Sequence, residues 1–165
     1  MRLPLFMTTA QLLENELTNV LYGQPWYGSS VYSILNAVTF ESAYEKPVGA
    51  SHTIAAIILH MVSWTEEVID RINEKPAGMP LSGDWPDYGK PDEEKWKNWI
   101  EDFKLVNVNL VKLIREMPEA YWDQPIIDER DTGPVVTHTE LVKGLIQHHI
   151  YHSGQIALLN KIING

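Results

Sequence analysis

The sequence predicts an all-α protein: a four-helix bundle with a long crossover connection between helices one and two. Four long segments carry apolar residues spaced three and four apart, which is the period of an amphipathic helix. No convincing sheet accompanies them, and proline or glycine bounds most of the segments. With 165 residues, the chain is long enough for a real core, and we expect a single domain over residues 1–165.

The first predicted helix runs from about Thr8 to Leu21 and ends before Gly23. Its apolar stripe consists of Leu12, Leu13, Leu17, Val20 and Leu21. The connection that follows, residues 23–49, contains a short helical segment around residues 31–35. This connection is long enough to cross over one end of a bundle.

The second predicted helix starts near Ser51, a residue suited to an N-cap, and continues to about Asn73. Its stripe consists of Ile54, Ile57, Ile58, Met61, Trp64 and Val68. Pro76 ends this helix. The segment 76–89 is rich in glycine, proline and aspartate, which is typical of an exposed loop, and it carries Trp85.

The third predicted helix opens with an acidic first turn at residues 92–94, which suits the positive end of a helix dipole, and continues to about Met117. The fourth begins near Thr137, because Thr137 and Glu140 fit a capping box, and continues to the chain terminus. Between these helices, residues 118–136 are compatible with a short pair of strands.

Composition excludes several classes of function. A formal net charge of −9 argues against a nucleic-acid partner and disfavours an anionic membrane surface. No stretch approaches the roughly 20 apolar residues that span a bilayer, and the first residues lack the apolar core of a signal peptide, so we expect a cytoplasmic protein. Because the chain has no cysteine, any metal must be held by imidazole and carboxylate, and any reacting thiol must come from the substrate.

Residues 147–155 hold three of the six histidines. His148 and His152 are four apart, so on a helix they share one face and can bind one metal ion together. They lie in an apolar seam, where an unpaired polar group costs about 1–3 kcal/mol, so a metal or a buried hydrogen-bond network is expected there. His149 and His152 also share a face and define an equally valid seam with Val142, Leu145 and Ile156. Spacing alone does not choose between His148 and His149.

A third metal ligand is expected from another helix, because bundles build metal sites from facing helices. His60 lies on the apolar side of the second predicted helix and is the best candidate. His52 falls at the start of that helix and is expected to be exposed. His138 precedes His148 by ten residues, which is about 15 Å along a helix, so it cannot share the same ion.

The residues around these histidines resemble the DinB-like superfamily, and within it the branch of YfiT-type predicted metal-dependent hydrolases. The resemblance rests on His-Met-Val-Ser-Trp at residues 60–64 and on His-His-Ile-Tyr-His-Ser-Gly-Gln-Ile at residues 148–156. Residues 26–30 and 84–86, together with Trp96, also resemble the family pattern. The similarity therefore covers nearly the whole chain.

The resemblance implies a four-helix bundle with a crossover connection, commonly a homodimer, that holds one divalent metal ion, zinc or nickel. Carried onto this sequence, the family pattern makes His60, His148 and His152 the ligands and selects His148 over His149. Several members are transferases that use a low-molecular-weight thiol, such as bacillithiol or mycothiol, as cosubstrate. Others are predicted hydrolases, and many have no demonstrated reaction.

Two enzyme hypotheses follow, because zinc both lowers the pKa of bound water to about 7 and stabilises a deprotonated thiol. The first is thiol-dependent S-transfer to a small-molecule substrate, and the second is hydrolysis. Hydrolysis usually needs a general base, and no carboxylate occurs after Lys143, although Glu67 remains a candidate. Tyr151 is a candidate donor to a bound ligand, or a packed interface residue, and Gln155 is a candidate partner that orients a ligand. A metal-stabilised stress-response protein without catalysis is the third hypothesis.

Overall fold

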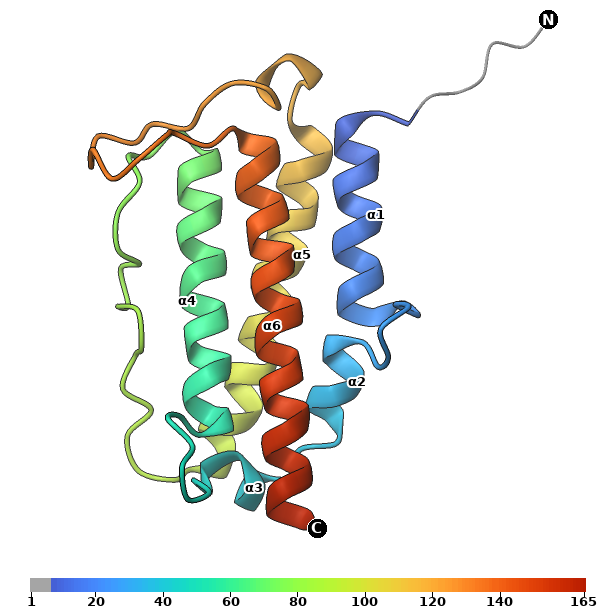
Figure 1. The fold of residues 1–165 in the computed structure, drawn as a ribbon, viewed down its shortest axis with the longest axis vertical. Helices are drawn as coiled ribbons and strands as arrows, with labels where there is room; N and C mark the ends of the chain where they lie inside the picture. The colour runs from blue at the N-terminus through green and yellow to red at the C-terminus, as the bar shows by residue number, and fades with distance from the viewer. Residues whose placement is uncertain (1–6) are drawn as a thin grey trace, which may run out of the picture.

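The computed structural model describes residues 7–165, and its regular elements are helical throughout that range. Four long helices lie side by side (Figure 1): α1 (Thr9–Tyr22), α4 (Ile54–Ile72), α5 (Glu93–Glu116) and α6 (His138–Asn164). Short elements fill the connections: α2 (Val31–Asn36), α3 (Phe40–Tyr44) and the 3-10 turn η1 (Glu119–Tyr121). The all-α prediction is confirmed. Where a strand pair was considered, the structure has one isolated bridge between Pro125 and Thr137.

Local side-chain chemistry sets where the long helices begin. A side-chain oxygen accepts a hydrogen bond from a backbone N–H of the first turn at Thr8, Thr53, Asp92 and Thr137. The predicted capping box of Thr137 and Glu140 is confirmed. The second predicted helix begins later than expected, because the hydroxyl of Thr53, and not that of Ser51, accepts from the Ala56 N–H at 3.1 Å.

The direction of the helices decides which segment runs along the bundle. In Figure 1, α4 and α5 run the same way, whereas α1 and α6 run the opposite way. Consecutive parallel helices need a return connection of bundle length, and residues 73–92 provide it along the outer side of α4. The sequence prediction placed the long crossover after the first helix. In the structure, residues 23–53 with α2 and α3 lie across one end of the bundle. The lengthwise crossover is residues 73–92, whose composition does not distinguish it from a loop at the end of the bundle.

The buried core draws on all four long helices. Fully buried side chains include Leu17, Ile58, Phe103, Leu110 and Ile146. α4 and α1 each contact both α5 and α6, so the four helices form a closed ring around this core. In consequence α4 and α6 pack against each other in antiparallel directions, and their shared seam carries the candidate site.

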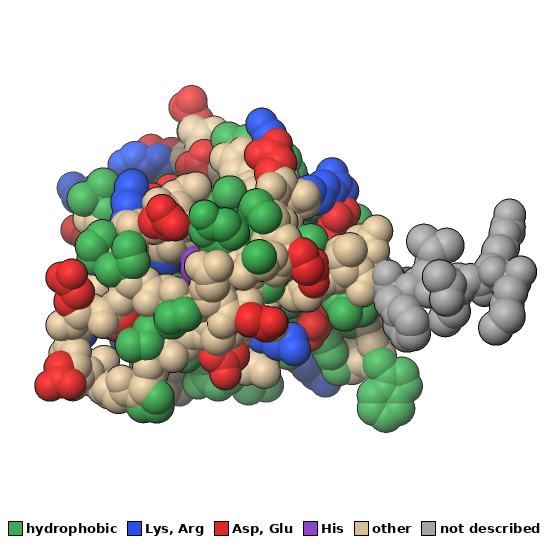
Figure 2. Space-filling model, turned by 90° about the horizontal axis from the view of Figure 1, so that it is seen from above, with side chains coloured by type: hydrophobic (Ala, Val, Ile, Leu, Met, Phe, Trp, Pro, Cys, Tyr) green, Lys and Arg blue, Asp and Glu red, His purple; other side chains and the backbone are tan. Residues whose placement is uncertain are grey.

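The end of the molecule that carries the α5–α6 connection has a mixed surface. Seen from the end covered by the α5–α6 connection, acidic and basic side chains are interspersed with apolar ones, and no continuous basic stripe crosses this face (Figure 2). Over residues 7–165, no helix is both long and apolar enough to cross a bilayer.

Candidate metal centre

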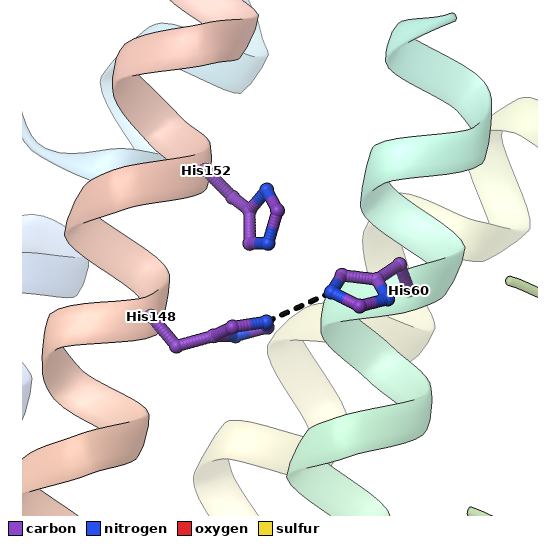
Figure 3. Close-up of side chains that lie close together, drawn as sticks. All are labelled: His60, His148 and His152. Atoms are coloured by element: carbon purple, nitrogen blue, oxygen red, sulfur yellow. Dashed lines mark hydrogen bonds between the residues drawn. The ribbon is translucent and has the colours of Figure 1, made fainter. Parts of the chain in front are cut away.

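Three histidines meet on the seam between α4 and α6. His60 from α4 and the pair His148 and His152 from α6 point toward one another (Figure 3), and one ring nitrogen of each lies within 4.8 Å of the other two. The closest approach is 2.9 Å, between Nε2 of His60 and Nε2 of His148. The ring of His152 lies 4.4 Å from that of His148 and 4.7 Å from that of His60, measured between centroids. The structure therefore brings together the three histidines that the family resemblance selected.

The crossover segment fixes the orientation of His60. The Nδ1–H of His60 donates to the backbone carbonyl oxygen of Asp84 at 2.6 Å, and the Asp84 Oδ1 lies 3.3 Å from the same nitrogen. Because both oxygens only accept, Nδ1 carries a proton, and this contact selects the tautomer whose Nε2 lone pair is directed at the other histidines. Two more bonds hold the segment to α4: Trp64 Nε1 donates to Asp84 Oδ1 at 2.7 Å, and the Ser63 hydroxyl donates to the Gly83 carbonyl at 2.6 Å.

His152 is oriented from within α6. Its Nδ1–H donates to the side-chain Oε1 of Gln155 at 2.6 Å, so its Nε2 also remains unprotonated. His148 has no such partner: its Nδ1 is buried and makes no hydrogen bond within residues 7–165. Two of the three imidazoles are thus held in the tautomer that offers Nε2 as a ligand.

Burial keeps these imidazoles neutral. Desolvation, followed by the proximity of His152 and His60, lowers the pKa of His148 to about 3. Desolvation also lowers the pKa of His152, and the hydrogen bond to Gln155 opposes part of that shift. Metal ions bind the neutral imidazole, so both side chains are in the ligand form at pH 7.

The donor set fits one divalent transition metal. Three converging imidazoles, two of them donating Nδ1–H to outer oxygens, match the ligands and outer partners that zinc and nickel sites use. No second group of three or more histidine, aspartate or glutamate side chains with such spacing occurs among residues 7–165. The carboxylate of Asp84 is engaged by Trp64 and stands behind His60.

His149 faces the other side of α6. It is fully buried, its Nε2 lies 3.1 Å from the Oδ1 of Asn107 on α5, and its ring packs edge-on against Phe103. Spacing left His148 and His149 as equal candidates. The structure directs His148 toward His60 and His149 toward the core.

The remaining histidines lie outside the triad. His138 donates from Nδ1 to the Gln124 carbonyl at 2.9 Å and so anchors the preceding loop. His52 is not fully exposed, because its ring stacks on Trp85 with centroids 3.5 Å apart. The opposite face of Trp85 stacks on His60 at 3.9 Å, so this indole lies between the two imidazoles.

The three candidate catalytic residues have different surroundings. Gln155 contacts His152 directly, as an orienting partner would. Tyr151 packs its ring beside His152 but is 64% exposed. Glu67 is buried, accepts from Arg71 Nε and from the Gly78 N–H at 2.9 Å each, and lies two helical turns beyond His60. Their catalytic roles stay predictions.

Two site residues lie outside the predicted ligand and catalytic set: Asp84, which holds His60, and Trp85, which covers it and which the sequence offers, with Trp26 and Trp64, only as a pocket-lining residue. Both lie in the crossover 73–92. The Asp-Trp-Pro run at residues 84–86 is part of the family resemblance, and it is the one sequence feature that points to this segment. The composition of this run does not predict that it lies beside α4, where His60 is 24 positions earlier in the chain.

A cavity of about 280 Å³ adjoins the triad along the α4–α6 seam and is lined in part by His148 and Trp64. A larger cavity, about 620 Å³, lies between α4 and α5 and contains none of the three histidines. The triad therefore has a neighbouring space in which a small molecule can lie.

The fold and the site together define a helical-bundle protein with an imidazole centre suited to one divalent ion. The chain belongs to the DinB superfamily, whose sequence profile matches residues 29–156, a range that includes all three histidines. This superfamily is metal-binding.

A solved structure supports the fold. A DinB-like protein from Bacillus subtilis, YjoA, is similar to this chain with a TM-score of 0.59 and 15% identity over 93% of both chains. At that identity the likeness concerns the fold alone. No curated protein matches the sequence.

Proposed function

We propose that this protein is a divalent-metal-dependent S-transferase that joins a small electrophile to a low-molecular-weight thiol. In this proposal His60, His148 and His152 hold one zinc or nickel ion. The observation that carries it is the convergence of three imidazoles on the α4–α6 seam, two of them fixed by Asp84 and Gln155.

An ion held by three imidazoles keeps a coordination position for a further ligand and, as a Lewis acid, lowers the pKa of a thiol that binds there. The chain supplies the surroundings. Asp84 and Gln155 keep two imidazoles in the ligand tautomer, and Trp85 shields the face of His60. In the transfer, the thiol sulfur forms a bond to an electrophilic carbon, the leaving group departs with its electron pair, and the thiol proton passes to solvent.

The state of Glu67 favours S-transfer over hydrolysis. Hydrolysis usually needs a general base beside the metal-bound water to move protons during attack and departure of the leaving group, whereas a thiol bound as its thiolate attacks without one. Glu67, the carboxylate considered for that role, is bound to Arg71 and to a backbone N–H. The triad contains no carboxylate of its own.

The test combines metal content with turnover. Purified protein is loaded with zinc or nickel and mixed with 1-chloro-2,4-dinitrobenzene, with and without added thiols such as cysteine and bacillithiol. We expect about one ion per chain and a thiol-dependent rise in absorbance that His148→Ala abolishes. Turnover of a chromogenic ester without any thiol would instead identify a hydrolase, and metal binding without either reaction would indicate a non-catalytic protein.

The expected homodimer and cytoplasmic location stay predictions. Sedimentation or light scattering of the purified chain tests the first of them directly.

A further inference from the structure

The 280 Å³ cavity runs along the seam from the triad toward the α5–α6 connection. On α4 its lining begins at Trp64 and ends at Arg71, and on α6 it begins at His148 and ends at Glu140. Because these helices are antiparallel, Trp64 and His148 lie at one end while Arg71 and Glu140 lie at the other. Seven residues of helix separate Trp64 from Arg71 by about 10 Å along the axis. The Arg71 side chain reaches back over the indole, with its Cζ 5.6 Å from the centre of the Trp64 ring, so a small molecule lying here can contact both His148 and Arg71.

The walls of the cavity are mostly apolar. The indole of Trp64 and the side chains of Val68, Leu141 and Leu145 form them, and Val136 from the connection closes one side. This surface suits an aromatic or aliphatic body. The volume is near the lower limit of about 300 Å³ that is usual for ligand pockets, so the occupant is small.

One polar donor of the lining lies beside the Trp64 ring. Arg71 is only 7% exposed; its Nε donates to Glu67 and its Nη2 to the Gly78 carbonyl, while Nη1 makes no hydrogen bond within residues 7–165. Glu67 already balances the charge of the guanidinium, and the carboxylate of Glu140 lies on the same lining. The free N–H therefore suits a neutral oxygen acceptor better than an anion.

Gly144 is an exposed residue of the lining and lies between the two ends of the cavity. A glycine inside a helix costs about 0.5–1 kcal/mol relative to alanine. A Cβ built at position 144 would meet no atom within 4 Å, so packing in this chain does not require glycine there. Gly144 is exposed, so the missing side chain leaves the mouth of the cavity open, and a larger side chain would occupy that mouth.

We propose that this cavity binds the electrophilic substrate: a small, neutral, mainly aromatic or apolar molecule whose oxygen acceptor reaches Arg71 while its other end faces His148. The assignment of the His148 end as the reacting end rests on the proposed function. Binding in the cavity does not, because its walls are formed by the chain alone.

Fluorine NMR of the full chain tests the binding with two probes, 4-fluoroacetophenone, which carries a carbonyl acceptor, and fluorobenzene, which does not. We expect saturable broadening of both signals, with tighter binding of the ketone. Gly144→Leu should weaken binding by about tenfold or more because leucine fills the space, and Gly144→Ala should have a smaller effect in the same direction.

The matched control is Gly154→Leu, the same substitution on the same helix, where an added Cβ also meets nothing within 4 Å and which does not line this cavity. It should bind both probes as the unmodified chain does. Equal binding by Gly144→Leu, an equal loss in Gly154→Leu, or no preference for the ketone would each overturn the proposal. Because both variants replace glycine in a helix, neither should lower the unfolding temperature.

The metal state separates this inference from the proposed function. Binding that depends on Gly144 in a protein that takes up no metal would keep the cavity assignment and remove the enzymatic one. Metal uptake by the triad without probe binding would remove the cavity assignment and leave the proposed metal site standing. When zinc is replaced by paramagnetic Co²⁺, extra broadening of the bound fluorine signal is expected, and its absence would contradict a site beside His148.

Discussion

The two buried faces of α6 use histidine in different ways, although His148 and His149 are adjacent. Burial lowers the pKa of each to about 3, so neither charge nor pKa distinguishes them. What differs is the group that faces Nε2. For His148 it is the imidazole of His60 at 2.9 Å, and for His149 it is the amide oxygen of Asn107 at 3.1 Å. A buried neutral histidine becomes a candidate ligand only when other ligands converge on the same point.

The largest expected effect is on metal binding by the α4-facing side. His148→Ala removes one of three ligands, so affinity for zinc or nickel should fall by more than the 10–100-fold that an outer partner contributes. Metal content after dialysis measures this. If His148→Ala retained one ion per chain while His149→Ala lost it, His149 and not His148 would be the ligand on α6.

The second effect is on stability and belongs to the α5-facing side. His149→Ala leaves the Asn107 oxygen without its donor and opens a void in the core, so the free energy of unfolding should fall by about 2–4 kcal/mol. Urea titration of the metal-free protein measures this. The neighbouring Tyr151→Ala, at an exposed position, should cost less than about 0.5 kcal/mol. A similar loss in both variants would show that His149 has no special place in the core.

A smaller effect is expected at the partner of His152. Gln155→Leu removes the acceptor of the Nδ1–H, so metal affinity should fall about 10–100-fold while the ion remains bound at high concentration. Gln147→Leu provides the matched control, because Gln147 is an exposed glutamine on the same helix. Calorimetric titration compares the two. Equal affinities would show that Gln155 does not orient the ligand.

The smallest effect is at the start of α6, which sets the position of both faces. Backbone and side-chain hydrogen bonds from Thr137 lower the pKa of Glu140 below its ordinary 4.5. A lowered carboxyl pKa in the folded state means that the stabilisation is fully present above pH 4.5 and is lost as pH falls through the folded pKa. Glu140→Gln should therefore lower the unfolding temperature modestly at pH 7, and the difference should shrink as the pH falls below 4.5. A difference that is independent of pH would contradict this.

Sequence periodicity predicted the features that depend on regular helical geometry. The apolar stripes located all four long helices, and the capping residues located the start of α6. The i, i+4 spacing of His148 and His152 and the apolar position of His60 were enough to name the triad once the family resemblance was added. Periodicity could not separate His148 from His149, because α6 is buried on two sides and both seams are real.

The irregular parts of the site were not predictable in the same way. Asp84 and Trp85 act on His60 only because α4 and α5 are parallel and the crossover 73–92 runs back along α4. A loop of glycine, proline and aspartate carries no period that reveals its path. The second short helix, α3, was also missed, because five residues are too few to show a helical period.

The most direct test of the central claim is a crystal structure of the zinc-loaded protein with anomalous diffraction at the zinc edge. The account predicts one peak about 2.0–2.1 Å from Nε2 of His60, His148 and His152, with a further position open toward solvent or the cavity. A peak bound through His149, a fully protein-ligated ion, or a zinc ion elsewhere on the chain would contradict it.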